Sequence, residues 1–178
     1  MKQKNIKEEI FILLQKSKMH QRELERVLGI NQTNIRRALL IMEKENLVDK
    51  TEIGKNKIYF IKNSLEARIF VIISENYRLM KIIEKPEIKK IVKELLKNKK
   101  IKLAILFGSY AKNTDHKRSD IDIYIETTNP NIKKEVESIN SKISVKIGKF
   151  DKSNFLMKEI IDNHIIIKGV ERYYEIKS

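Results

Sequence analysis

Residues 108–122 read GSYAKNTDHKRSDID, and this stretch decides the fold of the second half of the chain. It consists of a Gly-Ser pair, ten further residues and an Asp-x-Asp motif. The residues before it, IKLAILF at 101–107, form an almost unbroken apolar run of strand length, which is typical of a strand covered on both faces. Gly108 and Ser109 therefore follow the end of a buried strand, where glycine allows the backbone to approach a ligand.

The end of the motif opens an alternating segment, SDIDIYIE at 119–126. Alternation predicts a strand with Asp120, Asp122, Tyr124 and Glu126 on one face and isoleucines facing the core. The two aspartates would lie about 7 Å apart along the backbone. Adjacent carboxylates repel unless a cation lies between them, and such oxygen ligands suit Mg²⁺ that also binds substrate phosphates. The alternative is an ordinary edge strand whose aspartates are merely solvated.

The whole arrangement resembles the signature of the DNA polymerase beta superfamily of nucleotidyltransferases, in particular its minimal members. The resemblance implies that Gly108 and Ser109 hold the nucleotide phosphates and that Asp120 and Asp122 are catalytic and bind Mg²⁺, two ions in the family. The implied reaction transfers an NMP from an NTP to an acceptor and releases pyrophosphate, with ATP and AMP as the expected nucleotides. Minimal members often act as the antitoxin partner of a helical toxin, so the resemblance also implies a toxin-like protein as acceptor and partner.

The superfamily pattern includes a third carboxylate on a later strand, and this chain departs from it. The next predicted strand, ISVKIG at 143–148, contains no Asp or Glu, and Lys146 aligns with the expected acid. Two hypotheses stay open: an enzyme, which here retains one or both ions, and a transcriptional regulator whose degenerate nucleotidyltransferase domain only binds nucleotide or a partner protein. An RNA-end or antibiotic-modifying transferase is a weaker third, because little chain remains for an acceptor-binding domain.

Composition narrows the class of partner. The formal net charge of +14 favours nucleic acid or nucleotide, although a lysine-rich and isoleucine-rich proteome would explain it equally well. The absence of cysteine excludes disulfides and thiolate metal sites, and three scattered histidines argue against a zinc centre. No apolar run approaches the roughly 20 residues of a membrane helix, so a cytoplasmic protein without a membrane partner is expected.

Residues 1–62 have the pattern of a winged helix-turn-helix. Apolar periodicity predicts a first helix through Ile6 and Ile10, a second at 21–28 that ends at Gly29, and a third capped by Asn31. Two strand-like segments, at 47–52 and 57–61, then flank a Gly-Lys-Asn turn. The pattern resembles the DNA-binding domains of many prokaryotic regulators. The residues expected on the DNA-binding face are Gln32, Thr33, Arg36, Arg37, Lys55 and Lys57.

Two alternatives to DNA binding stay open for this module. Winged helices also serve as protein-binding or dimerisation units, and the basic residues could be plain solvated surface in a basic protein.

The predicted domains are a winged helix-turn-helix at 1–62, a connecting or dimerisation helix at 63–84 and a nucleotidyltransferase domain at 85–178. The fold class is α/β (α+β), with a small mixed β-sheet flanked by helices in the second domain. The connecting helix carries a broad apolar stripe, which includes Leu65, Ile69, Ile73 and Met80. Such a stripe predicts burial against the other domain or against the same helix of a second copy, and a homodimer is expected. For 164–175 the pattern leaves open a strand and helix or a hairpin.

Overall fold

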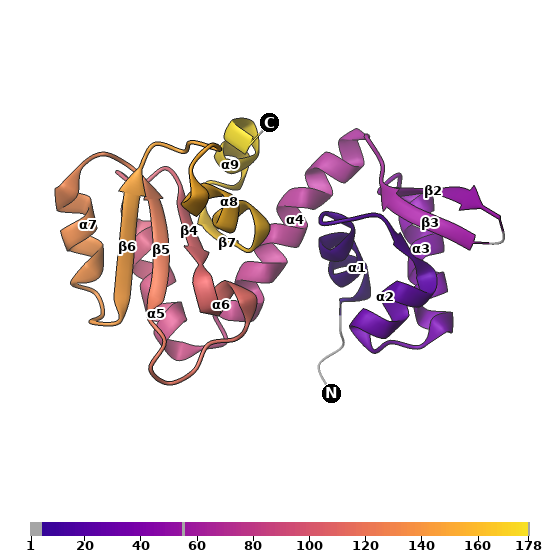
Figure 1. Ribbon diagram of the computed structural model, residues 1–178, viewed down its shortest axis with the longest axis horizontal. Coiled ribbons are helices and arrows are strands. Elements are labelled where there is room, and N and C mark those ends of the chain that lie inside the picture. Colours follow the sequence, from indigo (N-terminus) through magenta and orange to yellow (C-terminus); the bar gives the residue numbers. More distant parts are fainter. Residues whose placement is uncertain (1–4, 55, 178) are drawn as a thin grey trace. The chain divides into compact units, whose positions relative to one another are not determined.

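The computed structural model describes residues 5–54 and 56–177. The chain divides into two compact units, Met1–Tyr77 and Arg78–Ser178 (Figure 1). Each unit has its own hydrophobic core. The mixture of helices and small sheets is the α/β (α+β) class expected from the sequence. No helix in the described ranges has the length and hydropathy needed to cross a bilayer.

The N-terminal unit contains a small antiparallel sheet in the order β1-β3-β2 and the helices that precede and follow it. The strand β1 was not predicted, because two residues are too short to produce a periodic pattern. The elements are α1 (Ile6–Leu14), β1 (Met19–His20), α2 (Gln21–Leu28), α3 (Gln32–Lys44), β2 (Val48–Ile53), β3 (Asn56–Ile61) and the first part of α4 (Leu65–Ile82).

Local signals in the sequence set the boundaries of α2 and α3. Gly29 ends α2 with a left-handed φ of 63°, and its N–H donates to the Glu25 carbonyl at 2.9 Å. Asn31 caps α3, since its side-chain oxygen accepts from the Asn34 N–H at 2.9 Å. Both features were predicted. The helices α2 and α3 are thus joined by a tight glycine turn and followed by the β2–β3 hairpin, which is the order of a winged helix-turn-helix.

The helix α4 runs across the division between the two units. Its start is capped by Ser64, whose hydroxyl oxygen accepts from the Ala67 N–H at 3.1 Å. Ala67 and Phe70 belong to the first core and Ile82 to the second. Four residues of the predicted apolar stripe are exposed in the single chain. The exposed fractions are 70% for Leu65, 52% for Ile69, 46% for Ile73 and 65% for Met80.

The C-terminal unit is built on a mixed sheet in the order β6-β5-β4-β7. The strands β5 and β6 are parallel, and the other neighbours are antiparallel. Residues 164–175 form a strand and a helix rather than a hairpin. The elements are α5 (Pro86–Lys97), β4 (Ala104–Phe107), α6 (Gly108–Lys112), β5 (Ile121–Glu126), α7 (Pro130–Glu137), β6 (Ile143–Gly148), α8 (Phe155–Asp162), β7 (Ile165–Lys168) and α9 (Val170–Lys177).

The two faces of β5 have different surroundings. The isoleucines of β5 pack into the core with residues of α5 and α7, as the alternation predicted. On the opposite face, Tyr124 is buried, and its hydroxyl donates to the Gly148 carbonyl at 2.9 Å. Phe150 covers this tyrosine and in turn contacts Tyr173, with ring centroids 6.2 and 5.8 Å apart. The polar face of β5 is therefore closed at Tyr124 and accessible at Asp122, which is only partly buried.

Candidate functional site

The Gly-Ser turn and the Asp-x-Asp strand meet at one edge of the mixed sheet. The antiparallel pairing of β4 and β5 aligns Phe107 with Asp122, so Gly108 follows directly at the carboxylate. Gly108 has a φ of 68°, and an added Cβ there would overlap Oδ2 of Asp122 and lie 3.2 Å from its Cγ. Only glycine combines this backbone conformation with the space that the carboxylate leaves.

Ser109 lies on the short helix α6, which continues from this turn. Its backbone carbonyl accepts from the Thr114 N–H at 3.0 Å, so the end of α6 folds back on its start. Lys112, at the end of α6, donates to Oε1 of Glu159 on α8 at 2.8 Å. The structure therefore brings Gly108, Ser109 and Asp122 together and adds a carboxylate from α8 to their surroundings.

Asp120 lies just before β5 and is exposed, whereas Asp122 is partly buried. Burial raises the pKa of the Asp122 carboxyl above its usual range, and the negative charge of Asp120 raises it further. The positive charge of Lys146 opposes this shift, and Glu159 adds to it. The positive charge of Lys146 thus does not fully offset burial and the neighbouring negative charges, which disfavour the ionised form of Asp122. A cation bound beside Asp122 would favour that form.

The loop between α6 and β5 holds Asp120 at the start of the strand. Within it, the buried Ser119 accepts through its Oγ from the His116 N–H at 3.0 Å. Lys142, just before β6, donates to the Lys117 carbonyl at 2.8 Å. Asp115 forms an ion pair with Lys85. These contacts order the segment that leads into the Asp-x-Asp motif.

The strand β6 provides no carboxylate beside the aspartates. Its parallel register places Ser144 beside Asp122 and Lys146 beside Tyr124, one pleat further along the same face. No group of three His, Asp or Glu side chains suited to a metal ion is found among residues 5–54 and 56–177. The pair Asp120 and Asp122 fits one Mg²⁺ that completes its ligands with substrate phosphates, but the described side chains do not fit a protein cage for two ions.

The predicted DNA-binding residues of the N-terminal unit lie on α3 and β3. Gln32, Thr33, Arg36 and Arg37 are exposed on α3, and Lys57 is exposed on β3, where it pairs with Glu52 at 3.6 Å. Lys55 lies outside the described residues. A hollow of about 420 Å³ separates α3 from the hairpin, and Arg37 is not part of its lining. The lining residues are Gln21, Gln32, Thr33, Arg36, Leu40, Lys50, Lys57 and Tyr59.

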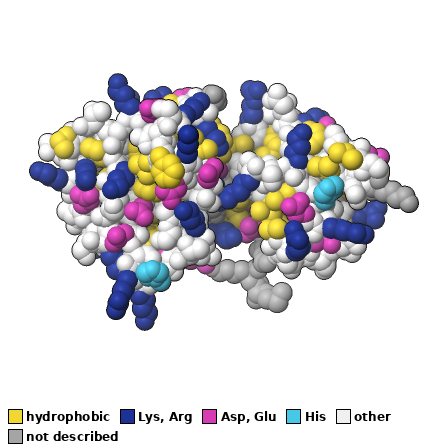
Figure 2. Space-filling view, in the orientation of Figure 1, with side chains coloured by type: hydrophobic (Ala, Val, Ile, Leu, Met, Phe, Trp, Pro, Cys, Tyr) yellow, Lys and Arg dark blue, Asp and Glu magenta, His cyan; other side chains and the backbone are white. Residues whose placement is uncertain are grey.

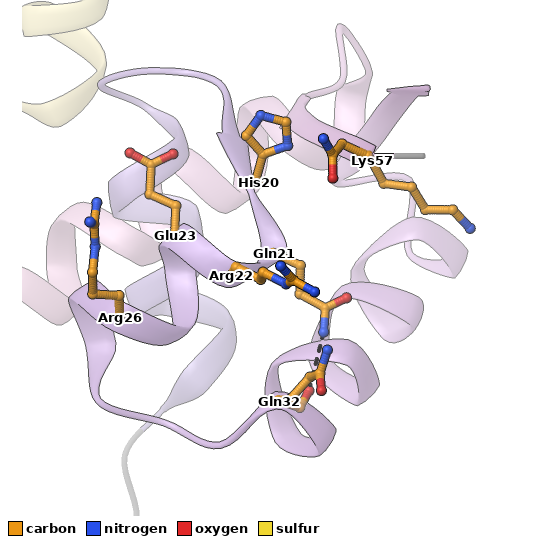
Figure 3. Close-up of a pocket in the computed structure, with 8 residues that line it drawn as sticks. His20, Gln21, Arg22, Glu23, Arg26, Gln32 and Lys57 are labelled. Carbon is orange, nitrogen blue, oxygen red and sulfur yellow. Dashed lines mark hydrogen bonds between the residues drawn. The ribbon is translucent and has the colours of Figure 1, made fainter. Parts of the chain in front are cut away.

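A second hollow, of about 720 Å³, lies between α2 and the hairpin (Figure 3). Gln21 joins α2 to α3 here, because its amide donates to the Gln32 carbonyl at 3.4 Å. The same amide donates to Oε1 of Glu25, one turn along α2, at 3.1 Å. The apolar periodicity of α2 indicates only a packing helix, and it did not reveal the polar residues that α2 and β1 contribute to this hollow. The spacing of Arg22 and Arg26, one helical turn apart, could have indicated them. The lining residues are His20, Gln21, Arg22, Glu23, Arg26, Gln32, Asn56 and Lys57.

Comparison with protein families adds an independent finding for the C-terminal unit. A family model described as Polymerase beta, Nucleotidyltransferase matches residues 89–172, which include the Gly-Ser turn, the Asp-x-Asp strand, β6 and α8. Residues 89–172 are a polymerase beta-type nucleotidyltransferase domain. The resemblance inferred from the motif is therefore confirmed for this part of the chain.

Comparisons with whole proteins found no curated match, and the solved structures described below match only part of the chain. Among solved structures, the transcriptional repressor BigR from Xylella fastidiosa is 19% identical, covers 36% of this chain and 63% of its own, and has a TM-score of 0.34. The adhesin competence repressor AdcR from Streptococcus pyogenes is 19% identical, covers 38% of this chain and 55% of its own, with a TM-score of 0.34. The matched region spans less than two thirds of either repressor, and the winged-helix assignment rests on the order of the elements.

Proposed function

We propose that this chain is a DNA-binding nucleotidyltransferase that transfers an NMP, AMP in the first instance, from a Mg²⁺-bound NTP to an acceptor. The observation that carries the proposal is the contact between Gly108 and the Asp122 carboxylate at the end of a buried strand. It joins the phosphate-binding half of the motif to the metal-binding half. The match of residues 89–172 to the nucleotidyltransferase family supports it.

The residues of the chain have distinct roles in this proposal. Gly108 leaves the backbone open to the phosphates, and the Ser109 hydroxyl donates to one of them. Asp120 and Asp122 would hold a Mg²⁺ ion, which would supply positive charge to the phosphates. In the transfer, the acceptor hydroxyl oxygen bonds to the α-phosphorus, its proton passes to solvent, and the bond to pyrophosphate breaks. The ion pair between Lys112 and Glu159 holds α6 against α8, and so keeps Ser109 in place.

A second candidate function is a regulator whose nucleotidyltransferase domain binds nucleotide without transferring it. The register of β6 favours this candidate, because the positions beside Asp122 and Tyr124 are Ser144 and Lys146. Neither side chain can replace the third carboxylate that the family uses to hold the second ion. Under this reading, nucleotide binding changes the state of a DNA-binding protein or its contact with a partner protein.

For the N-terminal unit we propose binding of duplex DNA. Support comes from the exposed polar face of α3 and from two adjoining hollows lined by Arg22, Arg26, Arg36 and Lys57. Side chains of this kind suit base edges and phosphates. The phosphate contacts would come from the basic residues at the rims of both hollows.

The expected homodimer also belongs to the proposal. The exposed stripe of α4, with Leu65, Ile69 and Ile73 at intervals of four residues, is the surface that a second copy would cover. Light scattering of the wild type and of Ile69→Glu would test it, since a dimer of this kind should become a monomer in the variant. A toxin-like protein acceptor rests on the family resemblance alone.

The two candidate functions of the C-terminal unit can be separated in one series. Calorimetry with Mg·ATP measures binding, and α-³²P-labelled ATP measures transfer to protein or nucleic acid acceptors. Binding with transfer that Asp120→Asn and Asp122→Asn abolish supports the enzyme, and binding without transfer supports the regulator. A chain that binds no NTP would contradict both.

A further inference from the structure

Phe155 is the most exposed of the large hydrophobic side chains in the part of the chain that the structure describes. It is the first residue of α8, and 84% of its surface is accessible. The start of the helix at Phe155 is ordered, because the Asn154 side chain caps it by accepting from the Leu156 N–H at 2.9 Å. The Phe155 ring therefore presents a large apolar face at the surface, largely uncovered by the residues that the structure describes.

Phe155 lies one helical turn before Glu159, a residue that contacts the helix of the candidate nucleotide site. Residues four apart in a helix share a face, with Cβ atoms about 5–6 Å from each other, so Phe155 lies on the same side of α8 as Glu159. Glu159 is bonded to Lys112 of α6, the helix that carries Ser109. It is also near enough to Asp122 for its charge to raise the pKa of that carboxyl. The helix α8 packs against β4, the strand that ends at Gly108.

The surroundings of Phe155 suit a flat ligand better than a protein surface. Its neighbours at the start of α8, Lys152, Ser153, Asn154 and Lys158, are polar and exposed. A protein interface would need a contiguous apolar patch, and a single ring among polar groups does not supply one. On the face of the C-terminal unit that Figure 2 shows, hydrophobic side chains lie beside acidic and basic ones.

We propose that the Phe155 ring is the platform on which the base of the bound nucleotide stacks while its phosphates lie at Gly108 and Ser109. The proposal rests on the nucleotide binding put forward above and adds the residue that holds the base. In this arrangement the ribose lies between the phosphate cradle and the ring. Because every base has a π-face, stacking on Phe155 gives affinity with little discrimination between bases.

The test compares a ligand that has a base with one that lacks it. Calorimetry measures binding of Mg·ATP and of Mg·tripolyphosphate to the full chain and to Phe155→Ala. Loss of a base–aromatic stack should weaken Mg·ATP binding about 5- to 150-fold. Binding of Mg·tripolyphosphate should stay unchanged. Because Phe155 is exposed, its removal creates no cavity, and thermal melting checks that the fold is retained.

Two further variants make the outcome specific. Phe155→Tyr keeps the ring and should restore Mg·ATP affinity, whereas Leu96→Ala removes an exposed apolar side chain from α5, which packs against β7, and should change nothing. Unchanged Mg·ATP affinity in Phe155→Ala, or equal weakening of both ligands, overturns the stacking role and turns attention to a protein partner at this ring. A wild-type chain that binds neither ligand overturns the proposed function itself, and the stacking role with it.

Discussion

The α-carbon of Gly108 lies against the carboxylate of Asp122, so closely that a methyl group on the glycine would overlap Oδ2. This contact joins the end of β4 to the second residue of β5, across the pair Phe107 and Asp122. The two parts of the sequence motif are therefore in direct contact in the fold. A change at either residue should affect the other.

The first prediction concerns Gly108→Ala. The left-handed φ of 68° alone should cost about 1–2 kcal/mol of unfolding free energy, and displacement of the Asp122 side chain should add to that cost and weaken Mg·NTP binding. Gly54→Ala is the matched control, because Gly54 has a φ of 61° and nothing lies within 4 Å of an added Cβ. Urea denaturation and calorimetry measure both effects. Equal costs for the two variants, with nucleotide binding intact in both, would show that the contact with Asp122 has no consequence.

The second prediction follows from the raised pKa of Asp122. Because the folded state binds the proton more tightly than the unfolded state, the ionised carboxylate destabilises the fold at neutral pH, and this penalty disappears as the pH falls below the unfolded pKa. Asp122→Asn should therefore melt at a higher temperature than the wild type at pH 7 without Mg²⁺. The difference should shrink towards pH 3.

The control for this prediction is Asp162→Asn, a change at an exposed residue of α8 that is not among the charges that shift the pKa of Asp122. Mg·ATP should reverse the order, since it stabilises only the chain that can bind the ion. A wild type that is more stable than Asp122→Asn at neutral pH without Mg²⁺ would mean that Asp122 is already compensated within the fold.

The third prediction concerns DNA binding by the N-terminal unit. Arg36→Ala and Lys57→Ala each remove a charge from the rim of a hollow, so each should lower the slope of log affinity against log salt by about one. Arg68→Ala changes the net charge equally at an exposed residue of α4 that lines neither hollow. Fluorescence anisotropy of a labelled duplex at several salt concentrations measures the slopes. Equal slopes for all three variants would indicate binding by overall charge alone.

Local sequence signals were sufficient for the strands and turns that form the motif. The apolar run before Gly108 and the alternation around Asp122 are properties of consecutive residues, and they predicted the two strands. That these strands pair and bring the two parts of the motif together is seen only in the structure. The same alternation suggested that Tyr124 shares the environment of Asp122. It does not, because Phe150, far along the chain, covers that part of the face.

Residues that reach the candidate site from distant segments could not be predicted. Glu159 and Phe155 belong to a helix whose periodicity shows only which side is buried, and their relation to Lys112 and Asp122 depends on how α8 packs on β4. The register of β6 relative to β5 could not be predicted from the sequence either. Alternation shows which residues share a face, but only the pairing with β5 shows that Ser144, and not Lys146, lies beside Asp122.

The last prediction concerns the position on β6 at which a third carboxylate would complete the site. Neighbouring strands lie about 4.8 Å apart, so an acid at position 144 would stand directly beside Asp122, whereas an acid at 146 would stand one pleat further along, beside Tyr124. Lys146→Asp also removes a positive charge that competes with a divalent cation, whereas Ser144→Asp keeps that charge. Comparison of the two variants therefore separates the effect of ligand position from the effect of charge. If geometry limits the reaction, Ser144→Asp should raise NMP transfer from labelled ATP more than Lys146→Asp does. If repulsion by Lys146 limits it, then Lys146→Asp and the neutral Lys146→Met should both raise transfer, and Ser144→Asp alone should not. Transfer by the unmodified chain that no variant increases would mean that the site works without a third carboxylate.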